Sequence, residues 1–354
     1  MDWTPPPDPD CPQCPYLPGL VIHATEHEPP AAFGLSKGYP RKTRRDPSRD
    51  LVQVIPKTAH VLEYPPEETQ WSPDKAPPRT ATLTITERLA NGSDRRAKLV
   101  VCRVLVKGHS RAYTAVAKIY DPLYYSPEGL GEAWVVKDAD SDYSCEALAY
   151  RSLQEPLHPQ KPGFTPDYYG SWTFDSVLTH QNKAYKRSIR LILIEHIQGT
   201  SMRNLYTSKH PDSEPDAFHY DEAYRLAVLA ELCEGWVKQI HGGINQRDLA
   251  PRNVMLAPSP QEGITPAGVP RVVLIDYNAA VVYEHHYLKP FPVTQKSLPP
   301  NPGDYFWNDD WSPFIGWCPK EWNNPERRKE LAQRWLSKTF LQNETDFVRM
   351  TEEP

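Results

Sequence analysis

The segment Asn245–Asn253, with the sequence NQRDLAPRN, places an aspartate and an asparagine five residues apart, at Asp248 and Asn253. A further carboxylate, Asp276, ends the apolar segment RVVLID. Phosphoryl transfer asks little covalent chemistry of a protein: it needs ligands for Mg²⁺, a cation on the phosphates and a group that orients the attacking hydroxyl. These three side chains can supply the metal ligands and that group, so the pattern predicts phosphotransfer.

A cation for the phosphates is available at Lys118, in the segment YTAVAKIYD, where small alanine neighbours leave room for a nucleotide. Glu146, in the segment DYSCEALAYRSLQ, can pair with the Lys118 ammonium and hold it in place. Two simpler interpretations remain open. Glu146 could be a surface residue of its helix, and Asn253 could only cap its own loop.

The elements that must position these residues follow from periodicity and turn signals. Short β-rich segments predict strands, and a turn at Asn91-Gly92 predicts a hairpin between the first two. The predicted strands are TLTIT (82–86), AKLVVCRVLV (97–106), 113–121, IRLILIEHI (189–197), VML (254–256) and RVVLID (271–276). Apolar spacings of three and four predict a long helix over 221–240, and the other predicted helices are 142–154 and one that begins at Asn324, before Pro325.

Composition excludes several classes of protein. The chain has 354 residues, a net charge of −5 and a pI near 6.2, which argues against binding to nucleic acid through phosphate neutralisation. No apolar run has the length of a membrane span, and the first residues do not resemble a secretory signal. Six cysteines in such a chain predict reduced thiols and a cytoplasmic or nuclear protein.

Of the 39 prolines, 17 precede Arg79, so residues 1–78 are predicted to form a largely irregular, Pro-rich extension. A short ordered piece is expected at 51–55. The basic run Lys37–Arg49 could be a docking or nuclear-import patch, or simply a solvated tail. The extension is a possible site for a protein partner.

The order of a strand lysine, a helix glutamate, RDLAPRN and a strand-ending aspartate resembles the protein kinase superfamily, in particular kinase-like proteins common in filamentous fungi. The resemblance covers Thr80–Asp276. It implies an α+β, two-lobed protein kinase-like fold over 79–345, with a small β-rich N-lobe at 79–198 and a mainly helical C-lobe at 199–345.

By the same resemblance, Asp248 is the catalytic aspartate, and Asn253 and Asp276 are Mg²⁺ ligands. Arg252 supplies the positive charge that many such loops carry as a lysine, at the position occupied here by Ala250. The implied cofactors are ATP and Mg²⁺, and the implied acceptor is a hydroxyl of unknown identity.

The nucleotide site implied by the resemblance has two parts. Lys118 and Glu146 form the ion pair that binds the phosphates of ATP. Ile194 lies behind the adenine, and the Glu195 carbonyl and the Ile197 N–H offer hydrogen bonds to the base.

The sequence departs from the resemblance in ways that leave two functions open. The segment 87–98 has one glycine where a glycine-rich phosphate loop is expected, although Arg95 or Arg96 could contact phosphate instead. Gln246 replaces a histidine that supports the loop, and Asn278 replaces a glycine, where it could adopt a left-handed conformation. The chain is therefore expected to be an ATP- and Mg²⁺-dependent phosphotransferase or, alternatively, a pseudokinase that acts as a nucleotide-binding or scaffold module.

The region after Asp276 contains 78 residues and no Ala-Pro-Glu motif, so poor activity on generic protein substrates is expected. Its tryptophans, at 307, 311, 317 and 322, are expected to pack in the core, or alternatively to line a pocket for a small acceptor.

Overall fold

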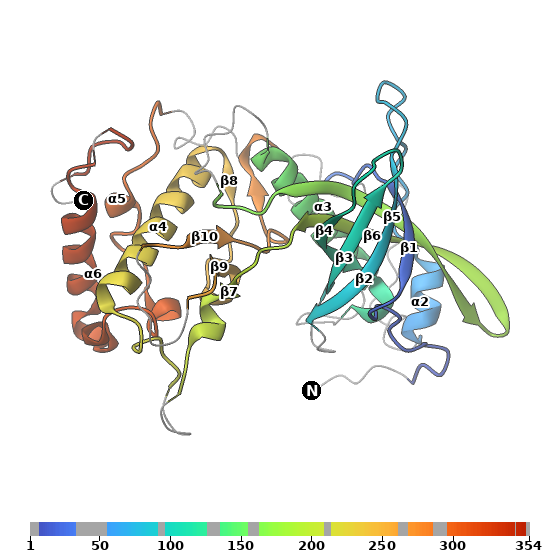
Figure 1. Cartoon of the computed structure of the whole chain (residues 1–354), viewed down its shortest axis with the longest axis horizontal. Helices are drawn as coiled ribbons and strands as arrows, with labels where there is room; N and C mark the ends of the chain where they lie inside the picture. Colours follow the sequence, from blue (N-terminus) through green and yellow to red (C-terminus); the bar gives the residue numbers. More distant parts are fainter. Residues whose placement is uncertain are drawn as a thin grey trace. The chain divides into compact units, whose positions relative to one another are not determined.

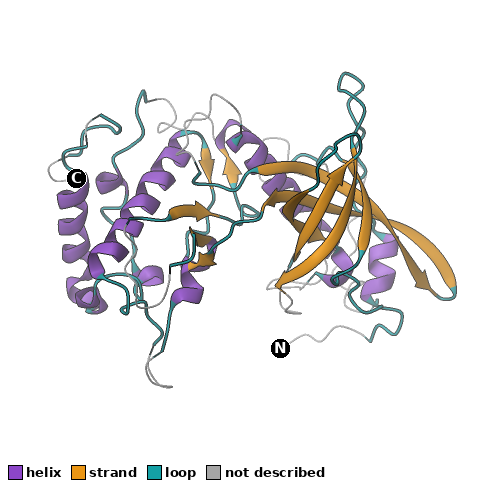
Figure 2. Ribbon diagram, in the orientation of Figure 1, coloured by secondary structure: helices purple, strands orange, loops and turns teal. Residues whose placement is uncertain are grey.

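The computed structural model describes residues 7–32, 55–90, 96–125, 135–154, 163–208, 214–260, 268–285, 296–343 and 345–351. Figure 1 follows the chain by sequence and Figure 2 by secondary structure. The chain divides into two compact units, which we call unit 1 (1–151 and 167–196) and unit 2 (152–166 and 197–354). Part of the predicted N-terminal extension therefore belongs to unit 1.

Unit 1 is built on a closed antiparallel barrel with the strand order β1-β2-β3-β4-β6-β5. Its strands are β1 (Val21–Glu26), β2 (Thr80–Ala90), β3 (Lys98–Val106), β4 (Tyr113–Tyr120), β5 (Tyr168–His180) and β6 (Lys183–Glu195). Strand β1 closes the barrel because it pairs with β2 on one side and β5 on the other. Side chains that alternate along the strands fill the interior, among them the fully buried Leu83, Val104 and Leu191.

The predicted two-lobed kinase-like fold is wrong. The described residues form a closed six-stranded barrel and five α-helices, and helix accounts for 31% of the structure. The physical cause is β1: it comes from the segment 1–78, which was expected to be largely irregular, and its pairing at both edges turns a small sheet into a filled barrel. Unit 2 also lacks the expected mainly helical architecture, because two small sheets share its described residues with three α-helices.

Two helices complete unit 1, α2 (Lys57–Glu63) and α3 (Val135–Leu153), with a 3-10 turn at Pro122–Tyr124. A buried cluster joins Val61 of α2 to Val135 and Val136 at the start of α3. Helix α3 carries Glu146, so this packing fixes one of the predicted site residues within unit 1.

A buried ion pair ties the end of β4 to the β5–β6 hairpin, and Tyr16 of the N-terminal segment bonds to the same carboxylate. The Arg187 guanidinium donates to both carboxylate oxygens of Asp121, over 2.8 and 2.9 Å. The hydroxyl of Tyr16 donates to the same carboxylate over 2.6 Å. Burial and the neighbouring Asp121 charge raise the pKa of the Tyr16 hydroxyl well above its usual range, so it remains a donor.

Unit 2 contains a three-stranded sheet, β10-β9-β7, and a two-stranded sheet, β11-β8. These strands are β7 (Thr200–Ser201), β8 (Ile244–Asn245), β9 (Val254–Ala257), β10 (Arg271–Leu274) and β11 (Val281–Val282). The helices are α4 (Glu222–His241), α5 (Pro302–Tyr305) and α6 (Pro325–Phe340), with 3-10 turns at Met202–Leu205, Pro251–Asn253, Tyr283–His285, Ser312–Phe314 and Lys320–Asn323.

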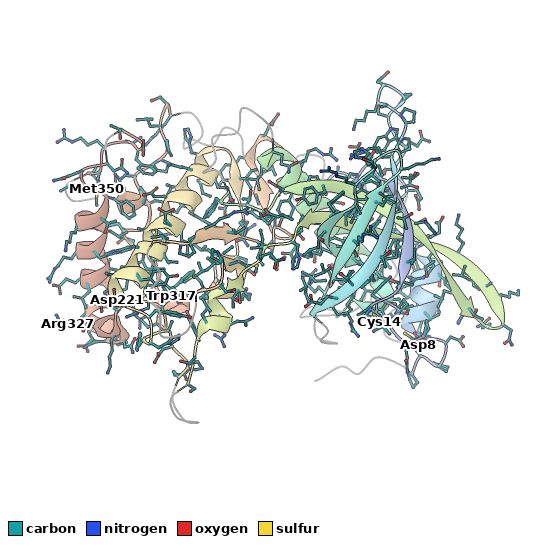
Figure 3. All side chains as sticks on the ribbon, viewed as in Figure 1. Asp8, Cys14, Asp221, Trp317, Arg327 and Met350 are labelled. Carbon is teal, nitrogen blue, oxygen red and sulfur yellow. The ribbon has the colours of Figure 1, made fainter. Side chains whose placement is uncertain are left out.

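The predicted strands and helices are confirmed as elements, although their bounds shift by several residues. Helix α6 begins after Asn324, whose side chain accepts from the Glu326 N–H. Helix α4 begins after Asp221, which caps it in the same way (Figure 3). The side-chain nitrogen of Trp317 donates to the Arg225 carbonyl on α4, and this contact holds the tryptophan-rich segment against the helix.

The expectation of tryptophans in the core is confirmed for Trp311, Trp317 and Trp322, all buried. Three expectations fall outside the described residues: the basic run Lys37–Arg49, most of the ordered piece at 51–55, and the turn at Asn91-Gly92. In the described part of the chain, no helix combines the length and the apolar character needed to cross a membrane.

Candidate functional site

The segment NQRDLAPRN forms a loop of unit 2 between β8 and β9, and its last three residues make a 3-10 turn. Asp248 lies at the centre of the loop contacts. Its two carboxylate oxygens accept from the guanidinium of Arg252, over 2.5 and 2.7 Å. The side chain of Arg252 is 63% exposed and that of Asp248 is 35% exposed, so this ion pair contributes little to stability and is easily exchanged for another partner.

Asn253 is buried and faces Asp248. Its side-chain nitrogen donates to the Asp248 carbonyl over 2.9 Å and to the Asp248 carboxylate over 2.8 Å. The structure therefore brings together Asp248, Arg252 and Asn253, three of the residues predicted from the sequence. The bonds within the loop agree with a capping role for Asn253, while its amide oxygen is the atom with which it can hold a cation.

Asp276 lies at the same end of the β9–β10 ladder as Asn253. Val254 pairs with Leu274, and the N–H of Ile275 donates to the Asn253 carbonyl over 2.9 Å. The two predicted metal ligands thus follow adjacent strand ends within unit 2. Asp276 has a φ of 65°, a left-handed conformation that is unusual for a residue other than glycine and is often found at functional sites.

The left-handed position was expected at Asn278, and this expectation is wrong. In the described ranges, the residues other than glycine with positive φ are Gln181, Asn182, Arg247 and Asp276. The strain therefore falls on the predicted metal ligand and on the residue before Asp248, rather than on the position where the sequence had replaced a glycine.

Gln246 connects the two aspartates, a role that the sequence indicated only as general support for the loop. Its side chain is fully buried. Its nitrogen donates to the carbonyls of Ile275 and Asp276, over 3.0 and 2.8 Å, and its oxygen accepts from the Asp248 N–H over 2.7 Å. One amide thus fixes the backbone at both predicted functional positions.

Lys118 and Glu146 meet within unit 1. The Lys118 ammonium lies 2.5 Å from the Glu146 carboxylate, and both side chains are buried. The alternative of a surface position for Glu146 is therefore wrong. Tyr120, two residues along β4 and so on the same face as Lys118, also donates to Glu146 over 2.5 Å. This partner was missed, although the period of two in a strand would have indicated it.

The residues predicted to contact the base lie on the two sides of the division between units. Glu195 ends β6 in unit 1, where its N–H donates to the Asp167 carbonyl over 2.8 Å. Ile197 belongs to unit 2 and is buried. Arg96, one of the two possible substitutes for a glycine-rich loop, pairs instead with Asp142 of α3 over 3.1 Å.

Among the described residues, no three or more histidine, cysteine, aspartate or glutamate side chains gather as a metal site. A set of one carboxylate and one amide oxygen, from Asp276 and Asn253, fits Mg²⁺ that arrives with a nucleotide. Such Mg²⁺ keeps several waters and takes its other ligands from the phosphates. The residues of unit 2 are therefore compatible with Mg²⁺–nucleotide and do not form a complete metal cage by themselves.

Comparison of the sequence with protein-family models and with curated proteins found no match. The assignment of function therefore rests on the local geometry of the Asp248 loop and the Asp276 turn.

Proposed function

We propose that the chain is an ATP- and Mg²⁺-dependent phosphotransferase with a hydroxyl acceptor. The observation that carries the proposal is the single hydrogen-bonded group formed by Asp248, Asn253 and the Asp276 turn, joined through buried Gln246. A reactive carboxylate and two oxygen ligands for Mg²⁺ are the groups that this reaction requires from a protein.

Each residue of unit 2 has a distinct role in the proposal. Asp276 and Asn253 offer oxygens to Mg²⁺, which when bound neutralises charge on the phosphates. Asp248 accepts a hydrogen bond from the acceptor hydroxyl, orients it and takes its proton. Arg252, which is exposed and pairs with Asp248 among the residues that the structure describes, can turn from that carboxylate to the transferred phosphate.

The proposed roles of Lys118, Glu146, Glu195 and Ile197 in binding the nucleotide rest on the sequence. Lys118 and Glu146 do form the expected ion pair. Nucleotide affinity measured on Lys118→Met tests this part of the proposal separately from the chemistry at Asp248.

A second function has a specific observation in its favour. Three N–H bonds from Arg252 and Asn253 occupy the Asp248 carboxylate, and an acceptor hydroxyl must displace or share one of them. If that exchange does not occur, the chain is a nucleotide-binding or scaffold module without turnover.

The decisive variant is Asp248→Asn, which keeps the size of the side chain but removes its charge. A positioned base contributes about 10²- to 10⁴-fold in rate, so we expect at least a hundredfold loss of Mg²⁺-dependent ATP turnover, with nucleotide affinity within a few-fold of the wild type. Asp175→Asn, an exposed aspartate of the β5–β6 hairpin, is the matched control. Equal turnover in wild type and Asp248→Asn contradicts the proposal, and binding without turnover in both selects the scaffold function.

A further inference from the structure

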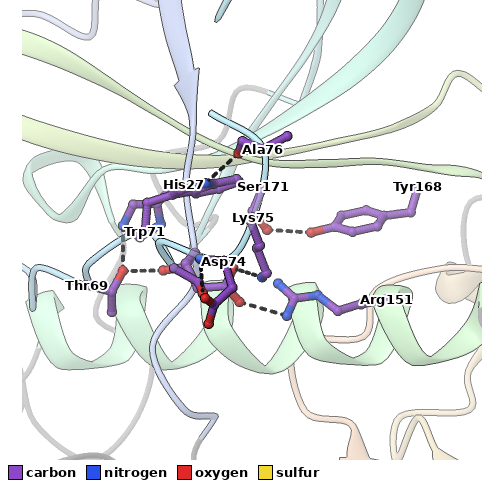
Figure 4. Close-up of polar contacts among 11 residues, drawn as sticks. His27, Thr69, Trp71, Asp74, Lys75, Ala76, Arg151, Tyr168 and Ser171 are labelled. Carbon is purple, nitrogen blue, oxygen red and sulfur yellow. Dashed lines mark hydrogen bonds and ion pairs between the residues drawn. The ribbon is translucent and has the colours of Figure 1, made fainter. Parts of the chain in front are cut away.

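The segment that connects α2 with β2, residues 65–79, consists mostly of exposed or half-buried residues, and we call it the strap. It lines a small pocket of about 180 Å³ together with β1, α3 and β5. Figure 4 shows the polar contacts of the strap with these elements. The pocket is lined by charged and aromatic side chains, including Glu28, Trp71, Lys75, Arg151, Tyr168 and Ser171.

One carboxylate holds two cations beside this pocket. Glu28 pairs with Lys75 of the strap over 2.5 Å and with Arg151 of α3 over 3.0 Å. The Lys75 ammonium nitrogen also lies 5.6 Å from the centre of the Trp71 ring. All three charged side chains are partly exposed, so the pairs are weak and open to competition from a stronger anion.

Ser72 and Lys75 occupy the two ends of one β-turn in the strap. The Lys75 N–H donates to the Ser72 carbonyl over 3.2 Å, and Pro73 takes the second position, which a turn of this kind favours. The hydroxyl of Ser72 accepts from the Asp74 N–H over 3.4 Å. Pro73, Asp74 and Lys75 are exposed, so the turn is open to a modifying enzyme.

The sequence of this turn, Ser-Pro-Asp-Lys, has the form that proline-directed protein kinases accept: proline directly after the serine and a basic residue two positions further on. The chain contains other Ser-Pro and Thr-Pro pairs, at Thr4, Ser126, Thr165, Ser259, Thr265 and Ser312. None of them has a lysine or arginine at the corresponding position. The combination therefore singles out Ser72.

We propose that Ser72 is a phosphorylation site, and that its phosphate takes Lys75 from Glu28 and so loosens this turn of the strap, while Thr69 and Arg79 keep their own contacts with Glu28 and Glu26. A phosphoserine carries a charge of about −1.5 to −2 and three acceptor oxygens, so it competes well with a single carboxylate for the ammonium. Ser72 and Lys75 already stand at the two ends of one hydrogen-bonded turn, which lowers the ordering cost of bringing them together. Arg151 then remains as the partner of Glu28.

The modification is a transfer from ATP by a separate proline-directed kinase. The Ser72 oxygen forms a bond to the γ-phosphorus, the bond from that phosphorus to ADP breaks, and the hydroxyl proton leaves to the base of the kinase. No oxidant or reductant is required.

The test uses the full chain carrying Asp248→Asn, so that the activity proposed above cannot supply the phosphate. The protein is treated with a cyclin-dependent-type kinase and ATP, and the modified residues are mapped by mass spectrometry. We expect phosphate at Ser72, at least tenfold more than at Ser259 or Ser312, and a loss of that signal in Ser72→Ala. Preferential labelling of Ser259 or Ser312 in the folded protein overturns the site.

Hydrogen exchange of the strap amides tests whether the phosphate takes Lys75 from Glu28. Because an exposed ion pair contributes little, we expect exchange over residues 67–76 to become about two- to fivefold faster on phosphorylation. Glu28→Gln should accelerate exchange similarly without phosphate, and phosphorylation of that variant should add nothing. Unchanged exchange in phosphorylated protein, or equal acceleration by phosphate in Glu28→Gln, overturns the proposed competition for Lys75.

Discussion

At the scale of single residues, the backbone around Asp248 and Asp276 depends on one buried amide. Gln246 makes three hydrogen bonds, and a hydrophobic side chain in its place leaves two carbonyls and one N–H without their partner. A fully buried polar group left without a partner costs about 1–3 kcal/mol, and these three groups are partly buried, so each costs less than the upper value.

We therefore expect Gln246→Leu to lower the free energy of unfolding by at least about 2 kcal/mol, since three partly buried groups each lose this hydrogen bond. Gln246→His should fall between this variant and the wild type, because a neutral imidazole keeps one donor and one acceptor. Urea unfolding followed by tryptophan fluorescence measures both. If Gln246→His loses as much stability as Gln246→Leu, then side-chain volume, and not hydrogen bonding, determines which residue fits at position 246.

At the scale of elements, strand β4 and helix α3 are joined by a buried charge pair. Lys118→Met removes the ammonium that faces the buried Glu146 carboxylate, to which Tyr120 also donates, and breaking such a pair costs about 3–5 kcal/mol. We expect the free energy of unfolding, measured with denaturant, to fall by this amount. Lys118→Met combined with Glu146→Leu should recover part of this stability, because neither charge of the pair remains. A double variant that is less stable than Lys118→Met alone contradicts the account.

The sequence predicts an element well when the residues that determine it are neighbours in the chain. The periodicity of α4 and α6, the cap of α6 and the strands β2 to β4 follow from neighbouring residues and were predicted. The closure of the barrel was not, because β1 is a six-residue segment in a proline-rich region and its role depends on pairing with β5, far along the chain. The Asp248 loop was predicted from residue types, whereas the Gln246 contacts and the left-handed Asp276 depend on where the loop and the turn meet.

At the scale of the whole molecule, a buried carboxyl makes stability depend on pH. Asp140 of α3 is 2% exposed and accepts from the Glu67 N–H of the strap over 3.2 Å. Burial raises the pKa of Asp140 to about 7, although the Arg190 charge opposes the shift. Arg190 also donates to the Glu67 carbonyl and pairs with Glu68, so both the N–H and the carbonyl of Glu67 are held.

Because the folded pKa of Asp140 lies above its unfolded value, the folded state binds the proton more tightly. Its contribution to stability is full below about pH 4 and is lost as the pH rises through about 7, by at most about 4 kcal/mol. Asp140→Asn keeps an acceptor for Glu67 but cannot titrate. We expect the variant to be more stable than wild type at pH 8 and the difference to vanish toward pH 4, as measured by chemical unfolding across this range. A constant difference over the range contradicts the assignment.

The most direct test of the account is calorimetric binding of ATP with and without Mg²⁺, to the wild type and to Asp276→Ala. The account predicts saturable binding that strengthens with Mg²⁺, and a rise in stability of about 2.7 kcal/mol at a hundredfold excess over Kd. Asp276→Ala should lose most of the Mg²⁺-dependent part, while the exposed control Asp175→Asn should keep it. If millimolar Mg²⁺–ATP gives neither heat nor a shift in the melting curve of the wild type, the proposed phosphotransfer is wrong.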